Sequence, residues 1–393
     1  MPLFGDSSII STLAWFGFFI VTMFFYPKLM LMQMMGKLEG TAVMLEGYTQ
    51  KARQIVTKRI TKEPSTELKE KIGNFMEFFA VEPINVDPYG IVNKLSHLVE
   101  QVEGKFKDFT KEVAPRMSPE DQASLVGGMS GAITMNQISK IVRHIVETVR
   151  KTKNLQLALV LQMQMPFIEK MAKSMLNGTE TMSNGWPMGD SAGPMVAAQL
   201  IGDSKGKEIR DTIVVRKKIK GRNVVILKAK GPGGRLGKEW ELVESEVKRG
   251  KIAKILSIDA AGKLEGEKTG SLAEGVGVAM GSFYRAYIEN IATVKKVPIE
   301  SVAIKMSPEE AVMNMPLDVL KAIPKATSLV ESNIKNTKQK GAIIVLGVGN
   351  TSGVGNDKKS AKSAEEKIKE VARMMKRREE SENHKRGFLR FWN

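Results

Sequence analysis

The N-terminal end of the chain carries one long apolar run. Residues 7–27, between Asp6 and Lys28, read SSIISTLAWFGFFIVTMFFYP and contain no charged side chain. A helix of about 20 apolar residues spans the roughly 30 Å hydrocarbon core of a bilayer. The acidic start and the bulky residues after the run are unlike the basic start and small-residue cleavage site of a secretory signal. The sequence therefore predicts a transmembrane helix over residues 7–27.

The charges beside this run predict its orientation. Asp6 precedes the run, whereas Lys28, Lys37, Lys51 and Arg53 follow it. Because the cytoplasmic flanks of membrane helices carry an excess of Lys and Arg, the C-terminal bulk is expected in the cytoplasm. The chain is thus predicted to be a single-pass protein of the cell membrane.

A helical period follows the apolar run. From about Met30 to Leu176 the apolar residues recur every three or four positions, which predicts a cytoplasmic helical domain over residues 28–176. Prolines divide this stretch into several helices; they are Pro64, Pro83, Pro88, Pro115 and Pro119.

A methionine-rich stretch ends the helical region. Residues 157–176 read LALVLQMQMPFIEKMAKSML. Flexible methionine side chains adapt to varied surfaces, so this stretch would suit a groove for a protein partner. A stripe of this kind is also typical of an ordinary helical core.

The pattern changes after Asn177, where glycine becomes frequent and short β-branched runs alternate with helical segments. DTIVVRKKIKGRNVVILKA predicts two strands around a Lys-Gly-Arg-Asn turn, and AKILSID and AIIVLGVGN predict buried strands. These elements favour an α/β domain with a mixed sheet over residues 177–356, its site at the carboxyl ends of the strands. Residues 357–393 form a basic tail, expected as a surface helix or a mobile arm.

The formal charge of +17 is concentrated in two stretches. Residues 205–254 hold 16 Lys and Arg against 6 Asp and Glu, and residues 357–393 hold 12 against 7. Such local charge attracts phosphate-bearing partners, here RNA, a ribosome or anionic lipid. A merely solvated basic face is the alternative. The candidate contact residues in the predicted hairpin are Arg216, Lys217, Lys218, Lys220 and Arg222.

Composition removes several kinds of chemistry. The chain has no cysteine, which excludes disulfides, thiolate metal sites and a cysteine nucleophile. The histidines are His97, His144 and His384, each alone in its segment, which argues against a histidine-rich metal centre or a Ser-His-Asp relay. No motif specifies a cofactor or a metal ion.

Four glycine-rich segments in the α/β region are candidate ligand loops, because glycine lets backbone N-H groups approach an anion. None has the spacing of a P-loop or of a dinucleotide-binding turn. The candidate ligand-binding residues are Gly189, Gly193, Gly233, Gly234, Gly275, Gly277, Gly347, Gly349 and Asn350.

Two carboxylates accompany these loops. Asp190 precedes the apolar helix MVAAQLI, and Asp259 ends the strand KILSI. Carboxylates on neighbouring loops would share a proton, polarise water or bind a divalent cation. Helix capping by Asp190 and loop bracing by Asp259 are the structural alternatives. In the catalytic interpretation Asp190 is the base and the more buried Asp259 the acid, with amides near Gly275 and Gly277, or Gly347 and Gly349, facing a developing oxyanion.

The order of GDSAGPMVAAQL, ILSIDAAGKLEG, EGVGVAMG and AIIVLGVGNT resembles the motifs of the germination-protease and hydrogenase-maturation-protease superfamily. That resemblance implies a phosphorylase/hydrolase-like fold and, at the matching positions, a pair of functional aspartates, Asp190 and Asp259. It departs at the segment before Gly189, which reads as a loop where the superfamily has a strand, whose place AIIVLGVGN would then take. The whole chain also resembles a family of uncharacterised archaeal membrane-anchored proteins, a domain of unknown function.

These observations favour a membrane-anchored hydrolase-like protein, a peptidase or amidohydrolase that uses Asp190 and Asp259. Two alternatives stay open. One is a non-enzymatic membrane adaptor or scaffold whose basic surface docks RNA, a ribosome or anionic lipid. The other is a sensor for a nucleotide or another small anion.

Overall fold

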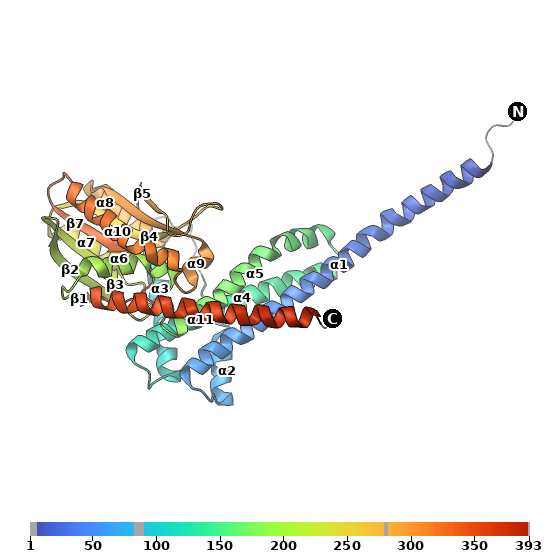
Figure 1. Cartoon of the computed structure of the whole chain (residues 1–393), viewed down its shortest axis with the longest axis horizontal. Coiled ribbons are helices and arrows are strands. Elements are labelled where there is room, and N and C mark those ends of the chain that lie inside the picture. Colours follow the sequence, from blue (N-terminus) through green and yellow to red (C-terminus); the bar gives the residue numbers. More distant parts are fainter. Residues whose placement is uncertain (1–5, 82–89, 279–281, 392–393) are drawn as a thin grey trace. The chain divides into compact units, whose positions relative to one another are not determined.

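The structure is a computed structural model that describes residues 6–81, 90–278 and 282–391. The chain divides into two compact units, one formed by Met1–Lys51 with Thr134–Lys173, the other by Ala52–Ile133 with Ser174–Asn393. Figure 1 shows the long N-terminal helix, the helical region and the sheet-containing part.

The first unit is a bundle of three helices. It contains parts of α1 (Asp6–Ile60), α4 (Pro119–Thr152) and α5 (Leu155–Ser183). Each helix turns one apolar stripe inward at spacings of three or four residues. On α1 this stripe is Met34, Leu38, Ala42 and Leu45; on α4 it is Met135, Val142, Val146 and Val149; on α5 it is Ala158, Leu161, Met165 and Ala172.

The start of α1 is apolar without being covered by the protein. Within the described residues, α1 is the helix long and apolar enough to cross a membrane, and its apolar stretch is not buried. Large apolar side chains from Leu13 to Met32 are exposed. Because water does not stabilise such a surface, this stretch is a candidate membrane anchor.

Shorter helices in the second unit confirm the helical middle region. α2 (Thr66–Phe75) begins at Ser65, whose hydroxyl accepts the Leu68 N-H, and α3 (Ile91–Val113) follows. The rings of Phe75 and Phe109 stack at 3.9 Å between the two helices. Pro64 and Pro115 lie between helices and Pro119 begins α4, as predicted, whereas Pro83 and Pro88 lie outside the described residues.

The described residues of the C-terminal part form a seven-stranded mixed sheet of strand order β1-β2-β3-β7-β4-β6-β5. β3, β7, β4 and β6 run parallel, and antiparallel strands complete both edges. The strand bounds are β1 Lys207–Ile209, β2 Thr212–Ile219, β3 Arg222–Ala229, β4 Ile252–Gly262, β5 Leu272–Val276, β6 Ile299–Met306 and β7 Ala342–Gly347.

The predicted hairpin is confirmed. β2 and β3 pair up to Ile219 and Arg222, which leaves Lys220 and Gly221 as a two-residue loop. Both loop residues have positive φ, 48° and 80°. A two-residue loop of this geometry matches the right-handed twist of the two strands, which is why a glycine stands there.

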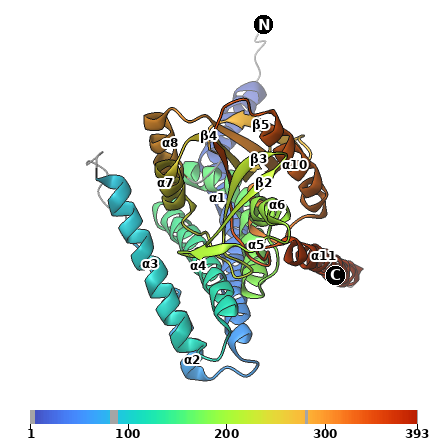
Figure 2. The same ribbon diagram turned by 90° about the vertical axis from the view of Figure 1, so that its left-hand side faces the viewer.

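Helices cover both faces of the sheet (Figure 2). α6 (Ala192–Ile201), α10 (Leu317–Asn336) and the first turns of α11 (Lys358–Phe391) pack on one face. α7 (Glu239–Arg249) and α8 (Ser282–Lys295) pack on the other. The short helix α9 (Pro308–Val312) begins at Ser307 with a capping box that involves Glu310. The predicted α/β architecture is therefore present, with apolar strands between two helical layers.

The segment expected to be a separate basic tail is part of this domain. α11 begins directly after Asp357, whose carboxylate accepts the Ser360 N-H at 2.8 Å. Ala361, Ala364 and Ile368 are buried against α6 and α10. The sequence had predicted a surface helix or a mobile arm here, because the segment is highly charged and its apolar residues are few. α11 thus packs on the α/β core, and the predicted boundary at Asn177 lies within α5 (Leu155–Ser183).

Replacing Ile368 with alanine tests this packing. The side chain is 1 % exposed, so Ile368→Ala should lower the free energy of unfolding by about 2 to 5 kcal/mol through lost burial and a residual cavity. Urea unfolding of the full chain in detergent measures the change. Glu366→Ala, at an exposed position of the same helix, should change stability by less than about 0.5 kcal/mol. Equal stability of parent and Ile368→Ala would mean that α11 is not docked.

Candidate site at the carboxyl ends of the strands

The parallel strands end together at one edge of the sheet. Lys228 on β3 lies level with Gly347 on β7, and Gly347 with Ile258 on β4. After β3 the chain passes to α7 on one face, and after β7 it passes to α11 on the other. Connections that leave neighbouring strands toward opposite faces open a crevice at the strand ends, where ligands of α/β proteins bind.

The turn before α6 is packed onto this edge through glycines. A side chain at Gly193 would place its Cβ 2.3 Å from the carbonyl oxygen of Ile258 and 2.2 Å from that of Val348. A Cβ at Gly349, where φ is 126°, would lie 2.0 Å from the carbonyl oxygen of Asp190. Only glycine permits such close backbone approach. These contacts bring Asp190 to the ends of β4 and β7.

Asp190 links the turn to the loop after β7. Its Oδ2 accepts the Asn350 N-H at 2.7 Å. The predicted capping role is not seen, because the helix begins at Ala192 behind Ser191, which makes no side-chain cap bond. Burial of the carboxyl group raises its pKa more than the Asn350 N-H lowers it.

Asp259 lies on β4, one residue beyond Ile258, which is the last position of β4 that pairs with β7. It is 8 % exposed, and its Oδ1 accepts the N-H of the next residue, Ala260, at 2.6 Å. Burial, as the larger cause, and the negative charge of Asp190 together raise the pKa of Asp259 to about 8. The two carboxyl groups therefore interact electrostatically, and Asp259 holds its proton at neutral pH.

Both carboxyl groups of this pair have a raised pKa, and burial is the largest cause for each. Within the described residues no cluster of three or more His, Asp and Glu side chains is placed to hold a metal ion.

The predicted ligand-binding glycines separate into groups. Gly347 and Gly349 lie beside the pair, but α6 occupies the space next to both: a Cβ at Gly347 would lie 2.4 Å from that of Ala197. Gly189 is packed against the carbonyl oxygen of Glu310 in the same way. These three glycines, with Gly193, are thus explained by backbone packing.

Gly275 and Gly277 do not join the pair. Gly275 on β5 lies level with Ser301 on β6 and Ser257 on β4, and the Gly277 N-H donates to Ile299 near the start of β6. Asp259 is four residues beyond the level of Gly277, roughly 13 Å along the strand direction. The expectation that these amides face an oxyanion at the aspartates is wrong. β5 runs antiparallel to β6, so it ends level with the start of β6, away from the strand ends where the aspartates lie.

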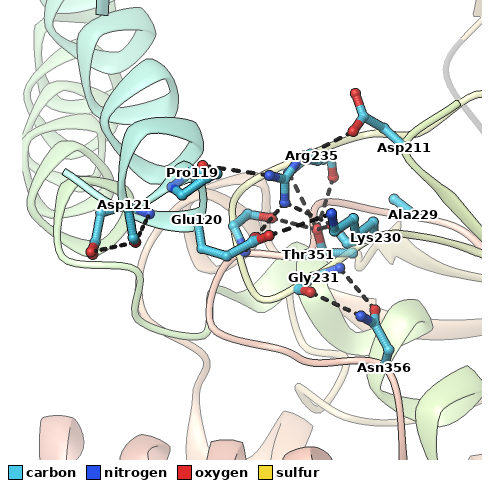
Figure 3. A network of polar contacts seen from close by, with 12 residues as sticks. Pro119, Glu120, Asp121, Asp211, Ala229, Lys230, Gly231, Arg235, Thr351 and Asn356 are labelled. Atoms are coloured by element: carbon cyan, nitrogen blue, oxygen red, sulfur yellow. Dashed lines mark hydrogen bonds and ion pairs between the residues drawn. The ribbon is translucent and has the colours of Figure 1, made fainter. Parts of the chain in front are cut away.

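Gly233 and Gly234 belong to a loop that meets the loop after β7 (Figure 3). A Cβ at Gly234 would lie 3.3 Å from Oδ1 of Asn350, and the Gly233 N-H donates to Glu120 at 2.9 Å. Thr351 and Arg235 hold the two loops together, since the Thr351 hydroxyl donates to Gly233 at 2.7 Å and Arg235 pairs with Glu120. This network fixes the loop that carries Asn350, and with it one partner of Asp190.

Two family models match the chain. The N-terminal domain of a protein of unknown function, DUF1512, matches residues 12–185, and the C-terminal domain of unknown function of DUF1512 matches residues 188–355. The chain belongs to the DUF1512 family. No curated protein and no solved structure matches it.

The C-terminal DUF1512 region contains both aspartates and the loop with Asn350, whereas α11 lies beyond its end. The N-terminal DUF1512 region contains the apolar part of α1 and the α4–α5 hairpin. The two regions meet just after α5, at the turn that leads into Asp190.

Sequence reasoning missed a second buried polar cluster in the C-terminal DUF1512 region. Lys228, at the end of β3, is fully buried, and its Nζ donates to Ala229 at 2.7 Å and to Asn356 at 3.0 Å. Burial lowers the pKa of Lys228 to about 7 and raises that of Glu239 to about 7. A lysine interrupting the apolar run VVILKA was the available signal. Asn356 also bonds both backbone groups of Gly231, so this cluster ties the two loops together.

Most side chains of the predicted basic contact surface have partners inside the protein. Arg216 pairs with Glu246 and Lys220 with Glu331, and Lys217 donates to the last carbonyl groups of α6. Arg222 donates to the carbonyl groups of Thr337 and Gln339. Lys218 is exposed on β2. Arg216 and Lys220 stay exposed although they are paired, so RNA, ribosome or lipid contact at this hairpin stays a prediction.

The raised pKa of Asp259 predicts a pH dependence of stability. An unfolded Asp ionises near pH 4, whereas native Asp259 ionises near pH 8, so between these values the native state holds a proton that the unfolded chain has lost. Stability therefore falls as pH rises through this window. Asp259→Asn removes this loss. The free energy of unfolding of the variant, relative to that of the parent, should therefore rise by on the order of 1 kcal/mol per pH unit across this window.

Urea unfolding of parent and variant between pH 4 and pH 8 measures the difference. Subtracting the two profiles removes contributions common to both chains, such as those of Lys228 and Glu239. Parallel profiles would show that Asp259 ionises as easily in the native protein as in the unfolded chain.

Proposed function

We propose that the protein is a membrane-anchored hydrolase-like protein of the peptidase or amidohydrolase class, with Asp190 and Asp259 as its acid and base. The observation that carries the proposal is the position of two carboxyl groups at the carboxyl edge of a parallel sheet, where the negative charge of Asp190 raises the pKa of Asp259. Pairs of this kind keep one proton between them at neutral pH, and such a pair can both take and give a proton.

The division of roles follows from the coupling between the two groups. The negative charge of Asp190 raises the pKa of Asp259, so Asp190 is the group that ionises first. In the proposed reaction, ionised Asp190 accepts a proton from water as the water oxygen attacks an amide carbonyl carbon. Protonated Asp259 donates its proton to the departing nitrogen, and the C-N bond breaks. The step leaves Asp190 protonated and Asp259 ionised, and proton exchange with water returns the pair to its starting state.

The resemblance to the germination-protease and hydrogenase-maturation-protease superfamily agrees with this proposal. Its Asp-x-x-Gly-Pro turn corresponds to Asp190 through Pro194, and its Ile-Asp-Ala strand end to Ile258 through Ala260. The superfamily's strand before the turn has no counterpart in sequence order, since α5 ends at Ser183 and leads into the turn. β7 ends at Gly347, beside the turn, where that strand would be expected.

Asparagine substitutions test the catalytic pair. Asp190→Asn and Asp259→Asn should each lower turnover of a peptide library by about 100-fold or more, because each removes one proton-transfer group. Cleavage products are measured by mass spectrometry, with folding checked by thermal unfolding. Parent activity should decline above about pH 8 as Asp259 loses its proton.

The matched control is Asp203→Asn, an exposed aspartate just after α6, which should keep parental turnover. Full activity in folded Asp190→Asn or Asp259→Asn would refute the paired-aspartate mechanism. An absence of cleavage by the parent across peptides and simple amides would refute the hydrolase proposal.

We further propose that α1 anchors the protein in the cell membrane through residues 7–27, with the remaining chain in the cytoplasm. Support comes from the exposed apolar surface of α1 and from Lys28 and Lys37 after the span. A protease added outside intact cells should therefore leave the chain beyond Lys37 uncut. Immunoblotting with an antibody against the C-terminal domain measures this, with detergent-opened cells as the positive control. Digestion of the domain in intact cells would contradict the orientation.

A further inference from the structure

The outer face of α5 is apolar and uncovered. Leu159, Val160, Met163 and Phe167 lie on one side of the helix at spacings of one, three and four residues, and all are exposed. Met163 is 80 % exposed. The inward face of the same turns, with Leu161 and Met165, is buried in the bundle. A helix that is apolar on both faces needs a second apolar partner outside the bundle.

Contacts within the first unit fix where this hairpin lies along α1. The Thr49 hydroxyl donates to the carbonyl of Met135, and Arg150 pairs with Glu39, so α4 runs antiparallel to α1. From Met135 to the end of α4 at Thr152 is about 25 Å at 1.5 Å per residue. The same length measured back from Thr49 along α1 reaches Met32.

Met32 lies four residues beyond Lys28, the first charged residue after the apolar run. Four helical residues rise about 6 Å. The headgroup layer on each side of a bilayer is roughly 5 to 8 Å thick. With α1 in the membrane, the turn between α4 and α5 therefore reaches the headgroup layer.

The charges at this turn suit an anionic surface. Lys151 and Lys153 flank it, and both are exposed. Arg150 is occupied by Glu39 and Glu147 on the bundle side, so acidic side chains close to the turn are already paired. Lysines next to a membrane helix are attracted to anionic lipids.

The size of the apolar stripe favours lipid over a protein. A stable protein interface takes about 20 to 30 residues from each partner, whereas this stripe offers four large side chains. A membrane contact can be much smaller, because α1 already holds the hairpin beside the bilayer and makes the second contact intramolecular.

We propose that the α4–α5 hairpin is a second membrane contact of this protein. In this arrangement α1 tilts toward α5, so that the stripe of Leu159, Val160, Met163 and Phe167 faces the headgroup layer with Leu159 and Val160 nearest the bilayer, and Lys151 and Lys153 bind anionic headgroups. The inference rests on the proposed anchoring by α1. It gives the bundle a fixed orientation to the membrane, since one tilt and one rotation of α1 satisfy both contacts.

The cysteine-free chain allows a direct test with single labels. Met163→Cys reports on the stripe, Ile141→Cys is a matched exposed apolar position on α4, and Phe18→Cys reports on the span. Each full-length variant is labelled with a polarity-sensitive fluorophore and reconstituted into phosphatidylcholine vesicles containing phosphatidylglycerol. Quenching by lipids with a spin label on the acyl chain is then measured.

Labels at Phe18 and Met163 should show blue-shifted emission and severalfold stronger quenching than the label at Ile141. Quenching at Phe18 without quenching at Met163 would overturn the hairpin contact and leave the anchor intact. Failure at Phe18 as well would refute both the anchor and the inference. A blue shift at Met163 that lipid does not quench, and that grows with protein density, would overturn the inference in favour of a second copy of the chain.

Charge reversal tests the headgroup contact separately. Lys151→Glu with Lys153→Glu, in the Met163→Cys chain, should lower the quenching at Met163 when phosphatidylglycerol is present. Phe18 quenching in the same background should not change. Equal quenching at Met163 with and without the two substitutions would refute the role of these lysines.

Discussion

The arrangement of the C-terminal domain depends on the close contact between the turn before α6 and the ends of β4 and β7. At Gly193 and Gly349 the backbones approach so closely that a Cβ would overlap carbonyl oxygens. This contact fixes α6 on the sheet, where α10 and α11 then pack around it. It also determines that Asp190 and Asp259, 69 positions apart in the chain, lie at one edge and influence each other's ionisation.

Two carboxyl groups in such a place reduce the stability of the fold. Burial without a nearby cation opposes ionisation of both groups, and the cost grows as pH rises. The surrounding loops are, by contrast, held by polar contacts, through Arg235 with Glu120 and through Lys228 with Asn356. Packing alone would favour apolar residues at the positions of the two aspartates, so this unfavourable pair supports the proposed function.

The first unit uses apolar surface differently. Its inward stripes form a bundle core, and the outer face of α5 and the start of α1 remain without protein cover. Both uncovered surfaces are explained by one proposed surrounding, a bilayer around α1 with its headgroup layer beside the α4–α5 turn. The methionine-rich composition of α5 suits this position, since flexible side chains adapt to a fluid boundary.

The sequence by itself determined the features that depend on neighbouring residues: the apolar run of α1, the helical period that follows, the hairpin at Lys220–Gly221 and the buried strands. It also gave Asp190 and Asp259 as candidate residues, from the loops that carry them. Only the tertiary structure decided that β7 inserts between β3 and β4 and that Gly275 lies on the edge strand β5. It also decided that Lys228 is buried and that α11 joins the core. Those outcomes depend on strand order and register, which are set by contacts between distant segments and leave no periodic signal in the chain.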